Sequence, residues 1–122
     1  MKVLVVVAHP DDVDFGSGGT VATWIAEGHE VVYCLVTDGQ AGGSDNTVTR
    51  EQVAQTRRLE QTAAAKILGV TELHWLGFQD GAVVADLNLR REISAIIRIV
   101  KPDRVLTQSA ERNYSRIYAS HP

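Results

Sequence analysis

The chain has 122 residues, of which 44% are hydrophobic, and a formal net charge of −3 from 12 basic and 15 acidic residues. This length and composition predict a single soluble domain with a buried core. Neither sign of charge forms a long run, which argues against binding to nucleic acid or to an anionic membrane surface, so we expect a small-molecule partner.

Hydrophobic periodicity and turn formers predict strands and helices in alternation along the whole chain. In order, we expect a strand at 1–8, a helix at 18–27, a strand at 30–37, a helix at 49–68, a strand at 72–76, a helix at 87–100 and a strand at 104–107. This order predicts an α/β fold, namely a Rossmann-like three-layer α/β/α architecture with a mostly parallel sheet. Ligands of such folds bind outside the carboxyl ends of the strands.

Three segments carry more specific expectations. The run from Met1 to Ala8 is apolar on both faces, which is typical of a strand at the centre of a parallel sheet. The polar loop at 38–46 follows the second strand and is expected to border a functional site. The apolar side of the long helix is expected to consist mainly of Val53, Leu59, Ala63, Ala64 and Ile67.

The compartment is inferred from what the sequence lacks. No apolar stretch is long enough to span a bilayer, and the N-terminal apolar run is shorter than that of a signal peptide. Cys34 is the single cysteine, which excludes an intramolecular disulfide and favours a buried thiol. A cytoplasmic location is therefore the default expectation.

His9 and Asp12 lie three residues apart at the carboxyl end of the first predicted strand. A turn at this place can aim an imidazole nitrogen and a carboxylate oxygen at one point, as a zinc ion requires. Asp11 lies between them and is then a candidate general base that takes a proton from water. In the alternative interpretation His9 merely ends the strand, and the two aspartates form a turn and cap the following helix.

The segment Ala8-His9-Pro10-Asp11-Asp12, followed by Gly18-Gly19-Thr20, resembles the opening motif of the LmbE-like (PIG-L) de-N-acetylase family. Thr37-Asp38-Gly39, the helix around Arg57, and the segments 76–81 and 101–107 correspond in order to later parts of that family. The resemblance implies zinc-dependent hydrolysis of an N-acyl group, commonly acetyl, on an amino-sugar conjugate or related amide. It also implies His9 and Asp12 as metal ligands and Asp11 as the base. Another divalent metal in place of zinc stays open.

The end of the chain resembles an incomplete family motif. Ser120-His121-Pro122 corresponds to the first half of the late His-Pro-Asp-His motif, which implies that His121 is a catalytic residue assisting the tetrahedral intermediate or the leaving amine. The motif's third zinc ligand would follow Pro122. We therefore expect residues 1–122 to be the N-terminal part of one deacetylase domain, without an internal boundary and inactive alone. Assembly into a homo-oligomer is one way to complete the open edge of its sheet.

The resemblance also implies two substrate-binding residues. These are Arg57 in the long helix and Asp80 in the turn before Gly81, although a solvated arginine and an ordinary turn aspartate are the alternatives. The sequence departs from the family at Val13, where a glutamate is frequent. Asp14 follows one position later and is a candidate to replace that glutamate in part.

A different class of function is a dinucleotide- or nucleotide-binding module without hydrolase activity. Gly16-Ser17-Gly18-Gly19 follows the first strand and Asp38 ends the second, as in a dinucleotide fingerprint. The third glycine position holds Val21 instead. Asp11 and Asp12 would also repel a pyrophosphate, so we rank this interpretation second.

Overall fold

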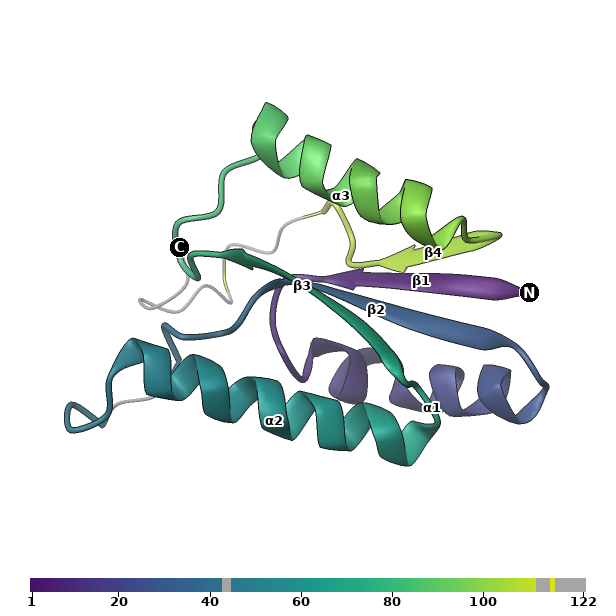
Figure 1. Cartoon of the computed structure of the whole chain (residues 1–122), viewed down its shortest axis with the longest axis horizontal. Helices are drawn as coiled ribbons and strands as arrows, with labels where there is room; N and C mark the ends of the chain where they lie inside the picture. The colour runs from purple at the N-terminus through teal and green to yellow at the C-terminus, as the bar shows by residue number, and fades with distance from the viewer. Residues whose placement is uncertain (43–44, 112–114, 116–122) are drawn as a thin grey trace.

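The computed structural model describes residues 1–42, 45–111 and 115, in which strands and helices alternate (Figure 1). In chain order the elements are β1 (Lys2–Val7), α1 (Asp12–Ala26), β2 (Glu30–Thr37), α2 (Arg50–Leu68), β3 (Glu72–Phe78), α3 (Leu87–Val100) and β4 (Arg104–Thr107). All strand pairs are parallel, in the order β3-β2-β1-β4. The predicted α/β fold is confirmed, with β1 in the interior of the sheet.

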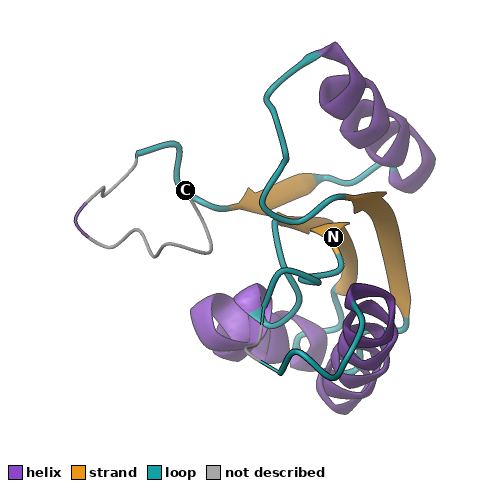
Figure 2. Cartoon of the chain, turned by 90° about the vertical axis from the view of Figure 1, so that its left-hand side faces the viewer, coloured by secondary structure: helices purple, strands orange, loops and turns teal. Residues whose placement is uncertain are grey.

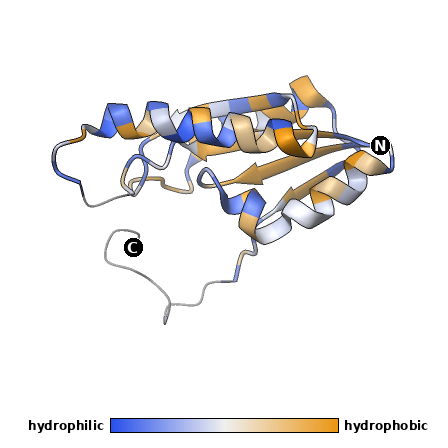
Figure 3. Ribbon diagram, turned by 90° about the horizontal axis from the view of Figure 1, so that it is seen from below, coloured by the Kyte–Doolittle hydropathy of each residue, from blue (hydrophilic) through white to orange (hydrophobic). Residues whose placement is uncertain are grey.

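Helices cover both faces of this sheet, with α1 and α2 on one side and α3 on the other (Figure 2). Val3, Val5 and Val7 of β1 pack toward the α1 and α2 side, whereas Leu4 and Val6 pack toward α3. Burial on both faces explains the continuous apolar run of β1, because its side chains from Val3 to Val7 meet a helix layer on either side of the sheet. Figure 3 shows the same apolar strands beneath the helices.

Helix α1 corrects one sequence prediction, because it begins at Asp12 rather than at Gly18. Gly16, Gly18 and Gly19 give α1 a low intrinsic helix propensity. Tertiary packing overrides that preference, since Val13 and Val21 are fully buried in the core beneath the helix. The turn after β1 is consequently short, and it brings Asp12 into the first turn of α1.

Strand β3 is longer than predicted, continuing through Gly77 to Phe78. Gly77 has a φ of 73°, and the pairing register between β2 and β3 shifts between Leu35 and Thr37. A residue of positive φ beside such a shift is typical of a β-bulge, which glycine tolerates because it lacks a Cβ. The glycine that suggested a turn is thus part of the strand.

The buried face of α2 also differs from the prediction. Leu59, Ala63 and Ile67 are exposed, and Gln61 and Ala65 are the buried residues instead. Val53 and Ala64 of the predicted apolar side are half-buried. The face of α2 that packs against the rest of the protein therefore includes a polar side chain, that of Gln61.

None of the helices in the described residues is both long and apolar enough to cross a membrane.

Candidate metal and catalytic site

Loops at the carboxyl ends of β1, β2 and β3 meet at one place, and His9 lies among them. Thr37, the last residue of β2, fixes the backbone just before His9, because its hydroxyl and its N–H both donate to the Ala8 carbonyl, at 2.8 and 2.9 Å. Thr37 is fully buried, so this anchor is shielded from water. These bonds connect the end of β1 to the end of β2 and hold His9 at the carboxyl end of the sheet.

The imidazole of His9 lies between two carboxylates. Its Nδ1 is 3.5 Å from Asp12 Oδ2, and its Nε2 is 2.8 Å from Asp80 Oδ1. Asp12 Oδ2 also accepts the His9 backbone N–H at 2.9 Å, which closes the turn. Pairing with Asp12 raises the pKa of His9 above its usual value, with a further contribution from the Asp80 charge, while burial acts in the opposite direction.

Asp80 is the most buried carboxylate of the site, with its side chain 1% exposed. Its Oδ1 faces His9, and its Oδ2 accepts the backbone N–H of Ala41 in the loop after β2 at 3.0 Å. Asp80 therefore joins three loops and holds one nitrogen of His9. These contacts favour a role in orienting His9, and the sugar contact implied by the family resemblance stays a prediction.

Asp11 is the N-cap residue of α1, with φ 71° and ψ −14°. Its side chain makes no cap hydrogen bond to the first turn of α1 but pairs with Arg57, whose Nη2 is 3.2 Å from Asp11 Oδ2 and 3.1 Å from the Pro10 carbonyl oxygen. The carboxylate is 55% exposed and therefore accessible to water. The interpretation of Asp11 as a simple helix cap does not fit this geometry.

Two glutamines that sequence reasoning missed complete the site. Gln108, just after β4, accepts the Ala8 N–H at 3.1 Å and donates to Asp12 Oδ2 at 3.2 Å. Gln61 of α2 accepts the Asp11 N–H at 2.6 Å. Neither belongs to a recognisable motif, and both are distant in sequence from their partners. The position of Gln61 one turn after Arg57 on α2 was the available signal.

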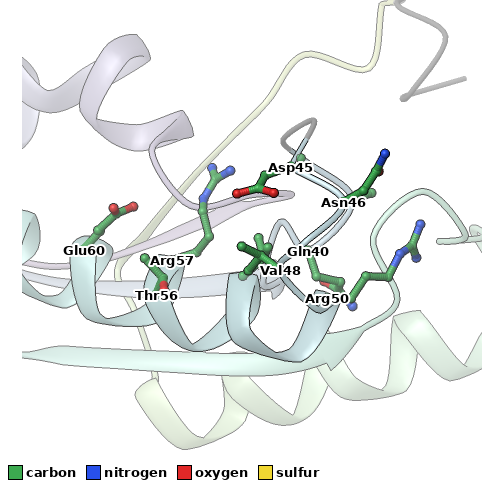
Figure 4. A pocket seen from close by; sticks show the side chains of 11 residues that line it. Gln40, Asp45, Asn46, Val48, Arg50, Thr56, Arg57 and Glu60 are labelled. Atoms are coloured by element: carbon green, nitrogen blue, oxygen red, sulfur yellow. The ribbon is translucent and has the colours of Figure 1, made fainter.

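A pocket of about 220 Å³ lies at this junction, and it is lined by His9, Asp11, Asp12, Gly39, Gly42, Arg57 and Asp80. A larger pocket of about 680 Å³ adjoins it and shares Gly42 and Arg57 (Figure 4). Asp45, Arg50 and Glu60 give this second pocket charged walls. Ligand pockets commonly fall in the range of about 300–1,000 Å³, so the larger pocket is wide enough for a small ligand beside the reactive groups.

His9 Nδ1 and Asp12 Oδ2 are of the donor types that zinc binds, and their separation allows both to contact one ion. Zinc bonds to nitrogen and oxygen are about 2.0–2.2 Å long, so atoms 3.5 Å apart can reach one ion. A carboxylate on the second imidazole nitrogen, here Asp80, is usual for metal-binding histidines. Within the described part of the chain, no group of three His, Cys, Asp or Glu residues is arranged to hold a metal ion.

Two further residues were predicted at the site, namely Arg57 and His121. Arg57 lies at the site, as described above, whereas His121 falls outside the described residues and its catalytic role stays a prediction. Two further histidines, which were not predicted as site residues, have other partners: His29 contacts the N-terminal amine of Met1, and His74 contacts Glu72.

The dinucleotide-binding alternative is not supported by the geometry. Gly16 to Gly19 lie within α1, beyond its first turn, and do not form the turn after β1 that cradles a pyrophosphate. Asp38, the acidic residue at the end of β2, pairs with Arg58 through two contacts of 3.0 and 3.1 Å. Neither feature of the fingerprint is available to a nucleotide.

Comparison with known proteins identifies relatives of this arrangement. The chain is 40% identical over 105 residues to the diacetylchitobiose deacetylase of Thermococcus kodakarensis, a match that covers 86% of this chain and 39% of that protein. Its fold matches the N,N'-diacetylchitobiose deacetylase of Pyrococcus horikoshii with a TM-score of 0.83 and 36% identity, over 85% of this chain and 39% of that one.

A second solved structure has a different activity. The 4-carboxy-2-hydroxymuconate hydratase GalB of Pseudomonas putida matches with a TM-score of 0.84 and 28% identity, over 99% of this chain and 51% of that one. The chain thus spans about two fifths to one half of the length of these relatives. The model of the GlcNAc-PI de-N-acetylase family, PIG-L, matches residues 4–122, and the chain therefore belongs to that family.

Proposed function

We propose that the full-length protein is a zinc-dependent hydrolase that removes an acetyl or related acyl group from the nitrogen of an amino-sugar conjugate. The observation that carries this proposal is the junction of His9, Asp12 and Asp11 at one pocket, with His9 Nδ1 3.5 Å from Asp12 Oδ2. Membership of a de-N-acetylase family supports the reaction class, and the deacetylases among the relatives support the substrate class.

His9 and Asp12 would hold the zinc. When bound, the ion supplies a Lewis acid that polarises the amide carbonyl and makes water more acidic. The remaining chemistry falls to the side chains. The Asp11 carboxylate is open to water, so it can take the proton of the attacking water molecule. Arg57 keeps that carboxylate turned toward the pocket through its contact with Oδ2.

The two adjoining pockets suggest how a conjugate would bind. The smaller pocket holds the reactive side chains, so the N-acyl group would enter there. The larger pocket offers the side chains of Asp45, Arg50 and Glu60, which suit the hydroxyl groups of a sugar (Figure 4). We therefore place the acylated amine beside Asp11 and the rest of the conjugate along the loop after β2.

Hydration of an unsaturated carboxylic acid is a second candidate, supported by the likeness to GalB over nearly the whole chain. Both reactions require an activated water molecule, so Asp11 would serve either one. The identities of 40% and 36% to deacetylases, against 28% to the hydratase, favour N-deacylation.

An assay with both substrate classes distinguishes these candidates. Zinc-loaded full-length protein is incubated with N,N'-diacetylchitobiose, other N-acetylglucosamine conjugates and unsaturated dicarboxylic acids. We expect free amine and carboxylate in equal amounts from at least one conjugate, and loss of that activity after chelation. Hydration of an unsaturated acid without any amine release would contradict the proposal, and so would the absence of amine release by a folded, zinc-loaded protein.

A further inference from the structure

Gln61 is a buried polar side chain of α2 that contacts the backbone of the site at Asp11. It lies on α2, is 2% exposed, and makes contacts of 2.6 Å from Oε1 to the Asp11 N–H and 3.0 Å from Nε2 to Asp14 Oδ2. A peptide N–H can only donate and a carboxylate can only accept, so these two partners fix the orientation of the amide. Glutamine is suited to this position because it offers one acceptor and one donor.

Asp11 needs such a partner because its backbone is strained. Its φ of 71° lies in the left-handed region, where the Cβ of a residue other than glycine comes too close to the following carbonyl oxygen. Gln61 binds the N–H of this residue, while Arg57 binds its carboxylate. Asp11 is thus held at its backbone and at its side chain from two successive turns of α2.

Asp14 accepts the second hydrogen bond of the Gln61 amide. Val13, which stands where the family often has glutamate, points into the core and is fully buried. Asp14 lies three residues after Asp11 and therefore on the same side of the first turn of α1. Its carboxylate holds Gln61 Nε2, so that Oε1 faces Asp11. A glutamate in place of Gln61 would set two carboxylates against each other.

We propose that Gln61, oriented by Asp14, is a positioning residue that holds the general base Asp11 in its strained conformation beside the pocket. The inference rests on the proposed function, because that function assigns Asp11 its role as base. It gives Gln61, which lies outside the first motif, a part in positioning the base. It also gives Asp14, the acidic residue that follows Val13, the role of orienting Gln61.

Reversal of the hydrogen-bond polarity tests the proposal. The variants are Gln61→Met, Gln61→Glu, Asp14→Asn and the double variant Gln61→Glu with Asp14→Asn, each made in the zinc-loaded full-length protein. In the double variant the introduced glutamate can still accept the Asp11 N–H, and the introduced asparagine can donate to the other oxygen of that glutamate. Gln55→Met is the matched control, because Gln55 is exposed on the same helix.

We expect Gln61→Met and Gln61→Glu to lower kcat by about 10- to 100-fold with KM and zinc content little changed, since misplacing a catalytic group by about 1 Å costs rate in that range. Asp14→Asn alone should be mild, because an asparagine oxygen still accepts from Gln61. The double variant should recover most of the activity lost in Gln61→Glu, and Gln55→Met should behave as wild type. A wild-type kcat in Gln61→Met would overturn the proposal, as would a double variant no faster than Gln61→Glu.

Amide hydrogen exchange separates this inference from the proposed function. The Asp11 N–H should exchange at least about 10-fold faster in Gln61→Met and regain protection in the double variant, whereas the Leu4 N–H in β1 should not change. If the wild-type protein deacylates nothing, the proposed function fails, and the exchange rates alone decide whether Gln61 holds Asp11. Unchanged exchange at Asp11 in Gln61→Met would overturn the inference even if the enzyme is active.

Discussion

Asp80 illustrates how a single buried carboxylate organises the site. It receives His9 Nε2 on one oxygen and the Ala41 N–H on the other, which links the loops after β1, β2 and β3. When a histidine binds metal through one nitrogen, a carboxylate on the other nitrogen sets its tautomer and orientation. In the proposed zinc site, the contacts of Asp80 would therefore affect metal affinity more directly than substrate binding.

Replacement of Asp80 by asparagine tests this role. If His9 Nδ1 holds the metal, Nε2 carries the proton, and two N–H donors would then face an amide that offers only one acceptor oxygen, so one contact must be lost. We expect the zinc dissociation constant to rise by about 10- to 100-fold, measured by competition with a chromophoric chelator. Glu51→Gln, an exposed change in the first turn of α2, is the control. An increase in KM with unchanged zinc affinity would favour the sugar contact instead.

From side-chain chemistry alone, the candidate site was predictable only where it is local in sequence, and Arg57 and Asp80 were named only through the family resemblance. His9, Asp11 and Asp12 are neighbours, so the chemistry of their side chains is visible in a single motif. Gln61 and Gln108 reach the same turn from α2 and from the end of β4. The sequence around a glutamine does not show which group its amide will bind. The contacts of Gln61 and Gln108 follow only from the folded arrangement of the parallel sheet and its helices.

At the scale of elements, α2 shows why apolar content alone misplaces a helix face. Leu59 and Ile67 are 74% and 85% exposed, while Gln61 faces inward with Ala65. The inner face supplies Arg57 and Gln61 to the site, so it cannot be uniformly apolar. The order of helices and strands was predicted correctly because it depends on short apolar-rich segments and on the turn formers between elements. Neither signal depends on how a helix is rotated.

Two neighbouring residues of α2 test its observed rotation. Ile67→Gln should change the free energy of unfolding by less than about 0.5 kcal/mol, because the side chain already lies in solvent. Leu68→Ala should lower it by about 2 kcal/mol, because Leu68 packs against the core of β1, β2 and α1. Urea denaturation measures both values. A larger loss from Ile67→Gln than from Leu68→Ala would mean that the helix is rotated toward the face predicted from sequence.

At the scale of the whole molecule, helices on both faces exclude water from the middle of the sheet. Cys34 of β2 reports on this region, because it is fully buried and burial raises the pKa of its thiol to about 11. The folded protein therefore holds the thiol proton at a pH where the unfolded chain has released it. The free energy of unfolding should fall as the pH rises from about 9 toward 11, since the unfolded state then binds fewer protons.

Comparison with Cys34→Ala isolates this effect, because other alkaline titrations are common to both proteins. Between pH 9 and 11 the native protein should lose about 2 kcal/mol of stability relative to the variant, measured by urea denaturation at each pH. The thiol should also resist a thiol reagent at pH 8 until the chain unfolds. Parallel stability curves for the two proteins, or rapid labelling of the folded one, would show that the sheet interior is open to water.

The central claim is that Asp11 performs chemistry at a zinc ion held by His9 and Asp12. Its most direct test measures zinc content by mass spectrometry, together with amine release, in the full-length protein and in the variants Asp11→Ala, His9→Ala and Asp12→Ala. We predict that Asp11→Ala keeps about one zinc per chain and loses at least about 100-fold in turnover, while the other two variants lose the metal. Equal metal loss in all three variants, or full activity in Asp11→Ala, would contradict it.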